Sequence, residues 1–267
     1  MIAMVDDLSS GVGSPEFVYP DWPAPGNVRA VFTTRNGGYS EAPCDCFNLG
    51  LHVGDNTEHV RSNRQLLVDA LELPAPPVYL NQVHGTDAVC AEDQLRDKNH
   101  AVAAADACWS NANSVIAIMT ADCLPVLFTS DCGQVIAGAH AGWRGLAEGV
   151  LEKTIESLPV KASRLLAWLG PAIGPDRFEV GAEVKECFVG RCAKSKVHFE
   201  AVGKSDRSAP EKYLANLYGL ARDRLTDAGV GSVYGGKHCT YSETDRFFSH
   251  RRDRGQTGRM AALIWKV

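Results

Sequence analysis

The chain has 267 residues, of which 45% are hydrophobic and 22% charged, and its formal net charge at pH 7 is −5. This balance is typical of a water-soluble globular protein, and the length is ample for a sizeable core. The negative net charge excludes the strong positive field shared by proteins that bind nucleic acid or anionic membranes, and no apolar run approaches the ~20 residues that span a bilayer. We therefore expect neither nucleic acid nor membrane as a partner.

The N-terminal segment differs in composition from the remainder. Residues 1–16 are rich in serine and glycine and lack periodicity, so we interpret them as a flexible leader and residues 17–267 as a single domain. The leader is acidic where a secretory signal is basic, which favours a cytoplasmic location. The nine cysteines include no C-x-x-C pair, and a chain of this length needs no disulfide staple, so we expect free thiols.

The first half of the chain reads mainly as strands. A strand is predicted over residues 28–35, and a helix over 57–73 with Thr57 as its N-cap. Short apolar runs separated by polar turns then predict strands over residues 77–85, 87–92, 114–121, 125–130 and 134–141.

The second half mixes helices with strands. Apolar residues at three- and four-residue intervals predict helices over 145–158, 182–192 and 211–229, with a strand over 164–173 between the first two. From residue 247 a basic loop leads into a final strand. Because strands occur both in succession and between helices, the pattern predicts a single α+β domain with a mixed sheet.

Three residues able to bind a metal lie where predicted strands run into loops: His84, Cys123 and His140. Zinc prefers nitrogen and sulfur ligands, and a catalytic zinc site supplies three of them and leaves the fourth position for water or substrate. The set fits such an open site. The plainer interpretation is a buried core thiol with solvent-facing histidines.

Neighbouring residues favour a functional site. Asp122 could orient a ligand histidine or take a proton from a metal-bound water. Gly142 and Gly145 predict a tight turn ahead of a helix whose N-terminus favours an anion. Arg144 at that turn would grip phosphate or carboxylate with two hydrogen bonds, unless it forms a surface salt bridge instead.

Eight segments between residues 28 and 265 occur in a characteristic order: TTRNGGYS, FNLGLHVGDN, NQVHGTDAV, TADCLPVLF, HAGWRGLAEGV, LGPAIGP, FEVG and FFSHRRDRGQTGRMAALIW. In these segments the chain resembles the YfiH family, long labelled multicopper polyphenol oxidoreductases (laccase-like) and later described as purine nucleoside phosphorylases. The resemblance implies a layered α/β/β/α fold shared with some cysteine deamidases. It also implies a zinc site made by His84, Cys123 and His140.

The implied activity is phosphorolysis of adenosine, inosine and methylthioadenosine, with adenosine deamination as a side activity. The partners are then purine nucleosides and phosphate, and we expect the protein to act as a monomer. Arg144, Arg251 and Arg252 are the candidates for binding phosphate. His250 stands where tyrosine is usual in the family, in a basic loop expected near the pocket, so it bears on substrate preference.

Two other activities remain as alternatives. A His-His-Cys set also matches a trigonal copper site, with Met119 as a conceivable axial donor, which suits a polyphenol oxidase. A multicopper cluster, however, uses paired His-x-His motifs, and none of the eight histidines forms one. A metal-free cysteine hydrolase would use Cys123 as nucleophile and His140 as base, which leaves His84 without a role. A binding or regulatory module is the remaining class, and the several polar motifs at loop edges argue against it.

Overall fold

The computed structural model describes residues 13–96, 102–203 and 210–267, so residues 1–12 of the predicted leader lie outside the described part. The leader's last residue, Glu16, is held by the domain. Its carbonyl accepts from Thr34 and its carboxylate pairs with Arg246. None of the described helices is long and apolar enough to cross a bilayer.

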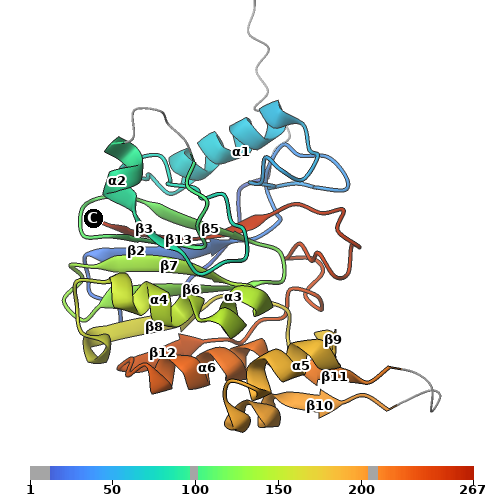
Figure 1. Cartoon of the computed structure of the whole chain (residues 1–267). Coiled ribbons are helices and arrows are strands. Elements are labelled where there is room, and N and C mark those ends of the chain that lie inside the picture. The colour runs from blue at the N-terminus through green and yellow to red at the C-terminus, as the bar shows by residue number, and fades with distance from the viewer. Residues whose placement is uncertain (1–12, 97–101, 204–209) are drawn as a thin grey trace, which may run out of the picture.

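Two sheets stack face to face at the centre of the molecule (Figure 1). The first is antiparallel throughout and runs in the order β1 (Phe17–Val18), β2 (Val28–Thr33), β13 (Met260–Lys266) and β5 (Ile116–Thr120). The second runs in the order β12 (Ser232–Gly235), β8 (Leu165–Leu169), β6 (Leu124–Ser130), β7 (Ile136–Ala141), β4 (Ala107–Ser110) and β3 (Ala88–Cys90). It is mixed, because its two outermost strands pair parallel with their neighbours and its central strands pair antiparallel.

Helices cover the outer faces of this sandwich. Figure 1 shows α1 on the side of the first sheet, with α3, α4 and α6 on the side of the second. A small third sheet lies beside α5 at one end, in the order β10 (Phe199–Ala201), β11 (Lys212–Ala215) and β9 (Glu179–Gly181). The helices are α1 (Thr57–Ala70), α2 (Ala91–Arg96), α3 (Trp143–Glu148), α4 (Val150–Ser157), α5 (Ala182–Val189) and α6 (Leu217–Asp227).

Alternation along the strands sorts side chains between the layers. In β5, Ile116 and Ile118 enter the core between the two sheets, whereas Ala117 faces the core beneath α1. In β6, Leu127 faces the first sheet and its neighbours Val126 and Phe128 face the helices. Successive side chains of a strand point to opposite faces, so each strand buried on both sides contributes to two cores, as in a four-layer fold.

Five predicted elements need correction. Helix α1 is capped by Asn56 rather than Thr57, because the Asn56 side chain accepts from the backbone of Glu58. Residues 77–85 form a loop with isolated bridges at Val78 and Asn81, not a strand. The strand predicted over residues 87–92 is shorter, since α2 begins at Ala91.

The other two corrections concern predicted helices. Residues 145–158 form two helices, because Gly149 adopts a left-handed conformation with φ of 109° and separates α3 from α4. Residues 211–229 begin as β11, which pairs with β9 and β10, before Asn216 caps α6 by accepting from Gly219. Strand pairing overrides the helical periodicity of residues 212–215.

We expect Gly149→Ala to lower the free energy of unfolding by about 1–2 kcal/mol, because an L-residue is strained at this left-handed angle. The added methyl group would meet nothing closer than Arg224 Nη2 at 3.5 Å, so the cost comes from the backbone alone. Urea unfolding measures it. Gly26→Ala is the matched control, since no atom lies within 4 Å of the new methyl group. Equal stability of the two variants would contradict this explanation.

Candidate active site

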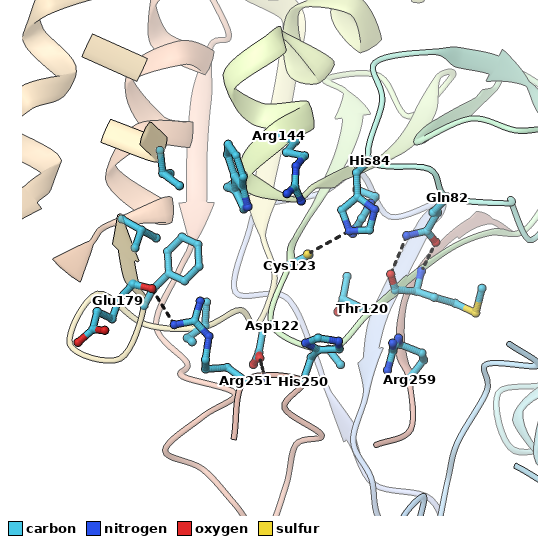
Figure 2. Close-up of a pocket in the computed structure, with 18 of the residues that line it drawn as sticks. Gln82, His84, Thr120, Asp122, Cys123, Arg144, Glu179, His250, Arg251 and Arg259 are labelled. Atoms are coloured by element: carbon cyan, nitrogen blue, oxygen red, sulfur yellow. Dashed lines mark hydrogen bonds between the residues drawn. The ribbon is translucent and has the colours of Figure 1, made fainter. Parts of the chain in front are cut away.

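A cavity of about 740 Å³ opens where three segments of the sandwich end together. Strand β5 ends at Thr120, β6 begins at Leu124, and β7 ends at Ala141. The loop between β5 and β6 carries Cys123, and the loop before β3 carries His84. Segments far apart in the chain therefore meet at one edge of the stacked sheets (Figure 2).

The structure brings together the three residues expected to hold a metal. The ligand atoms of His84, Cys123 and His140 all lie within 4.8 Å of one another. His84 Nε2 lies 3.9 Å from Cys123 Sγ, and the two imidazole rings meet edge to face with centroids 4.8 Å apart. Within the described ranges this is the one such group of donors. Two imidazoles and a thiol suit zinc, and they also suit copper.

Gly142 shows that this group is tightly enclosed. A Cβ atom at this position would lie 3.0 Å from His84 Cδ2 and 3.1 Å from Cys123 Sγ. Gly145 is constrained in the same way, since its Cβ would lie 2.6 Å from the carbonyl oxygen of Gly85. The expected tight turn does not explain why position 142 is a glycine, because its φ of −59° is open to any residue. Both glycines instead allow α3 to approach the two loops, which fits a site shaped to hold a small ion.

A buried carboxylate that the sequence analysis missed orients the two histidines. Asp106 is 0% exposed, and its Oδ1 lies 2.7 Å from His140 Nδ1. The same carboxylate accepts from the backbone N–H groups of Val83, His84 and Gly85 at 2.7–3.1 Å. Burial alone would raise the pKa of Asp106, but the hydrogen bonds from His140 and Gly85 outweigh it and lower the pKa. The ionised carboxylate therefore accepts from His140 Nδ1–H and leaves Nε2 facing the site.

The loop carrying His84 is held in an uncommon conformation. His84 has a φ of 62°, in the left-handed region that non-glycine residues seldom adopt. The bonds from residues 83–85 to Asp106 keep the loop in this state, which aims the imidazole at Cys123. Strained backbone at a ligand position is a frequent feature of functional sites.

Cys123 and His140 form a charge-separated pair. Burial opposes ionisation of the thiol, but the charges and hydrogen bonds of His140 and His84 outweigh it and lower the pKa of Cys123 to about 6. Burial likewise opposes protonation of His140, but Cys123 and Asp106 raise the pKa of the imidazole to about 9. Without a metal, the pair is a thiolate and an imidazolium at neutral pH.

Asp122 lines the cavity but does not orient a histidine, so that part of its expected role is wrong. Its carboxylate accepts from Thr240 Oγ1 at 2.6 Å, Ser249 Oγ at 3.0 Å and the backbone N–H of Arg251 at 2.7 Å. These bonds fasten the 249–251 loop to the floor of the site. Asp106 performs the orienting role instead.

The arginines expected to bind phosphate separate into two groups. Arg144 and Arg251 line the cavity, where their guanidinium groups lie over the rings of Trp143 and Phe178. Arg252 does not line it, because its guanidinium donates to the carbonyl oxygens of Thr240, Tyr241 and Phe247 and pairs with Asp253. Arg252 therefore stabilises the loop.

Two further cavity residues come from the basic loop that precedes β13. His250 lines the cavity, as expected from its position in that loop. Arg259 also lines it, although the sequence analysis did not select it. The signal that could have found Arg259 is its place directly before the final strand, whose partner β5 leads to Cys123.

Known proteins resemble the chain in both sequence and fold. Residues 29–267 match the family described as multi-copper polyphenol oxidoreductase laccase. The chain is 49% identical over 253 residues to a protein of Escherichia coli (strain K12) named purine nucleoside phosphorylase YfiH, an alignment covering 94% of this chain and 99% of that protein.

Two crystal structures of similar proteins extend the comparison. A Neisseria meningitidis protein superposes with a TM-score of 0.87 at 49% identity, covering 94% of this chain and 98% of that one. YlmD from Geobacillus stearothermophilus superposes with a TM-score of 0.81 at 31% identity, covering 94% and 96%. The single α+β domain expected from the sequence is confirmed.

We expect Asp106→Asn to weaken metal binding about 10- to 100-fold, because the amide cannot accept from all four donors that face the carboxylate. Competition with a chromogenic chelator measures this affinity. Asp122→Asn is the comparison variant: it changes a carboxylate next to Cys123 that bonds neither histidine, so metal affinity should change by less than about threefold. Equal losses in both variants would show that Asp106 has no special role.

We also expect the Cys123 thiol of the metal-free protein to react with iodoacetamide at a rate that is half-maximal near pH 6. A lowered pKa means that the thiolate persists down to that pH, whereas an ordinary cysteine needs a pH near ~8.5. Mass spectrometry of the Cys123 peptide follows the reaction, and the urea-unfolded chain supplies the ordinary midpoint. A folded-state midpoint near that of the unfolded chain would contradict the ion pair.

Proposed function

We propose that this chain, which belongs to the family described as multi-copper polyphenol oxidoreductase laccase, is a metal-dependent purine nucleoside phosphorylase. The observation that carries the proposal is the meeting of His84, Cys123 and His140 at the floor of a cavity with cationic walls. Its substrates would be inorganic phosphate with adenosine, inosine or methylthioadenosine. The ion would be zinc, and the protein would act as a cytoplasmic monomer.

The reaction sets three demands on the site. Cleavage of a glycosidic bond passes through a state resembling an oxocarbenium ion, so the ribose must be held while positive charge develops on it. Phosphate must be bound close to that carbon, and the departing base must be stabilised. A cavity of about 740 Å³ lies within the range of ligand pockets, and both reactants would share it.

The donor atoms that would hold the metal are already arranged before any substrate binds. Asp106 fixes the ring orientation of His140, and the neighbouring histidines keep Cys123 ionised, so the donor atoms are preorganised. When bound, a zinc ion would supply Lewis-acid polarisation, which serves phosphorolysis and also the proposed deamination of adenosine.

Positive charge lines the cavity from several elements. Arg144 comes from α3, Arg251 from the loop that Asp122 fastens, and Arg259 from the residue directly before β13. Each can offer a planar guanidinium to an anionic or aromatic group. This distribution supports an anionic co-substrate.

A second candidate function is supported by the order of Asp106, His140 and Cys123. A carboxylate holds an imidazole that in turn holds an ionised thiol, which is the arrangement of a cysteine hydrolase. In that case the protein would need no metal. Complete removal of metal with a chelator separates the two functions: a phosphorylase loses turnover and regains it with zinc, whereas a thiol hydrolase keeps it. Reloading with copper and assaying phenol oxidation tests the polyphenol oxidase alternative in the same preparation.

We expect base release from inosine to require phosphate and to yield ribose 1-phosphate, since phosphate is the proposed nucleophile. Deamination of adenosine uses water and should continue without phosphate. Chromatography of the products with and without phosphate measures both reactions. Base release that is independent of phosphate would mean hydrolysis and would sink the phosphorylase proposal.

We expect His140→Ala to reduce both reactions by at least about a hundredfold, because two remaining ligands hold a metal poorly. Metal content and turnover are measured on the same sample. His198→Ala is the control, since His198 pairs with Asp223 away from the cavity and should leave both reactions unchanged. Loss of activity with full metal content would assign His140 a role other than ligand.

A further inference from the structure

The cavity has two sides that differ in chemistry, separated by Cys123. Figure 2 shows Gln82, Thr120 and Arg259 on one side and Glu179 on the other. The first side is polar. The second side, which we call the aromatic side, is lined by Trp143, Phe178 and the aliphatic Val180.

Arg259 is a half-buried cation that faces the cavity, and among the described residues it has no direct ion pair; the charges of Cys123 and Asp122 act on it without contacting it. Its Nη1 donates to the carbonyl oxygens of Thr257 and Gly258, both at 3.1 Å, and its backbone N–H donates to Asn48. In the described part of the chain no carboxylate lies within ion-pair distance of its guanidinium, and Nε and Nη2 have no protein acceptor. Burial of a cation raises the free energy of the folded protein unless an anion lies nearby. An anionic ligand bound at this guanidinium would therefore be stabilised.

The rest of the polar side supplies further groups for such a ligand. The Thr120 residue is 2% exposed, and its Oγ1 has no hydrogen-bond partner among the described residues. His52 lines the cavity close enough to Arg259 that the guanidinium, after burial, lowers the pKa of the imidazole. The absence of a side chain at Gly50 leaves room for the Arg259 side chain, since a Cβ at position 50 would lie 2.8 Å from Arg259 Cγ.

The aromatic side suits a flat, weakly polar group. Arg144 lies over Trp143 with its guanidinium 4.4 Å from the ring centroid, and Arg251 lies over Phe178 at 5.4 Å while donating to Glu179 O. Both arginines are exposed and extend the aromatic surfaces. Glu179 and Glu183 also line this side. The Glu179 carboxylate pairs with Lys212, whereas the Glu183 carboxylate would repel phosphate and can accept from the N–H groups of a purine.

We infer that Arg259, with Thr120 and His52, forms the phosphate subsite, and that the purine base lies on the aromatic side, between Trp143 and Phe178. The inference rests on the proposed phosphorylase function. It replaces the arginines first expected to bind phosphate with one from the opposite wall.

The division matches the geometry of the reaction. Phosphate forms a bond from its oxygen to C1′ of the ribose as the bond from C1′ to the base nitrogen breaks. The electron pair of the broken bond goes to the base, which takes up a proton, so the products are ribose 1-phosphate and free base. A displacing oxygen approaches from the face opposite the departing group, so phosphate and base must lie on opposite sides of the ribose. The two sides of the cavity provide that separation, with the ribose beside Cys123.

Binding of inorganic phosphate to the full-length protein, as purified with its metal, tests the subsite directly by ³¹P NMR titration. We expect Arg259→Gln to weaken phosphate binding, and to raise the KM for phosphate, about 10- to 100-fold, with the KM for inosine changed by less than about twofold. Arg251→Gln should raise the KM for inosine and leave phosphate binding unchanged. Arg259→Lys keeps the charge but not the fork, so its phosphate affinity should be intermediate.

Arg64→Gln is the matched control. Arg64 is another half-buried arginine, which donates to Leu49 O and stacks on Tyr79 but does not line the cavity. It should leave phosphate binding and both KM values unchanged. If Arg259→Gln fails to fold, the lysine variant decides, since wild-type phosphate affinity in it would overturn the assignment.

Failure of the subsite can be distinguished from failure of the proposed function. If wild-type protein releases base without phosphate, the phosphorylase proposal fails, yet phosphate bound by wild type and lost in Arg259→Gln would still support an oxyanion subsite. Absence of phosphate binding by the wild type at millimolar concentration would overturn the subsite. Loss of phosphate binding in Arg251→Gln with full binding in Arg259→Gln would overturn it as well.

Discussion

The site depends on one buried carboxylate that accepts four hydrogen bonds. Asp106 stands immediately before β4, which pairs with β7 and β3 in the second sheet, and so is fixed by the sandwich itself. Its carbonyl accepts from the backbone of His140, and its side chain accepts from the ring of the same residue and from the loop that carries His84. A single side chain thereby transmits the rigidity of the sheet to two candidate metal ligands. A buried charge of this kind is tolerated because all its partners are in place.

The absence of side chains at certain glycines is the second requirement. Gly138 in β7 lets the two sheets approach, because a Cβ there would lie 2.7 Å from Ile118 Cγ1. Gly142 and Gly145 do the same for α3 against the ligand loops. These three positions lie within five residues of His140, so the segment that supplies a candidate ligand also sets the spacing of the layers around it. Interiors are packed closely enough that one added methyl group must displace its neighbours.

The sequence predicted the features that local rules determine. Strands β5, β6 and β7 followed from apolar runs bounded by turns, and the three candidate metal ligands followed from donor chemistry at strand ends and from family resemblance. Local rules did not reveal Asp106, because its partners lie 22 and 34 residues away in the chain. They also misassigned Arg252 and passed over Arg259, since the direction of a loop side chain depends on tertiary contacts that composition does not encode.

The pairing of Cys123 with His140 also shapes how the site would take up a metal. A zinc ligand must be a thiolate or a neutral imidazole, so binding releases any proton that blocks either donor atom. Here the thiol has a pKa of about 6 and the imidazole of about 9, so at neutral pH the single proton to be displaced sits on His140. Asp106 holds Nδ1–H, and the displaced proton is therefore the one on Nε2, which faces the cavity. Metal and proton therefore compete for His140 Nε2. The Asp106 carboxylate raises the affinity of this nitrogen for a proton and for a metal alike.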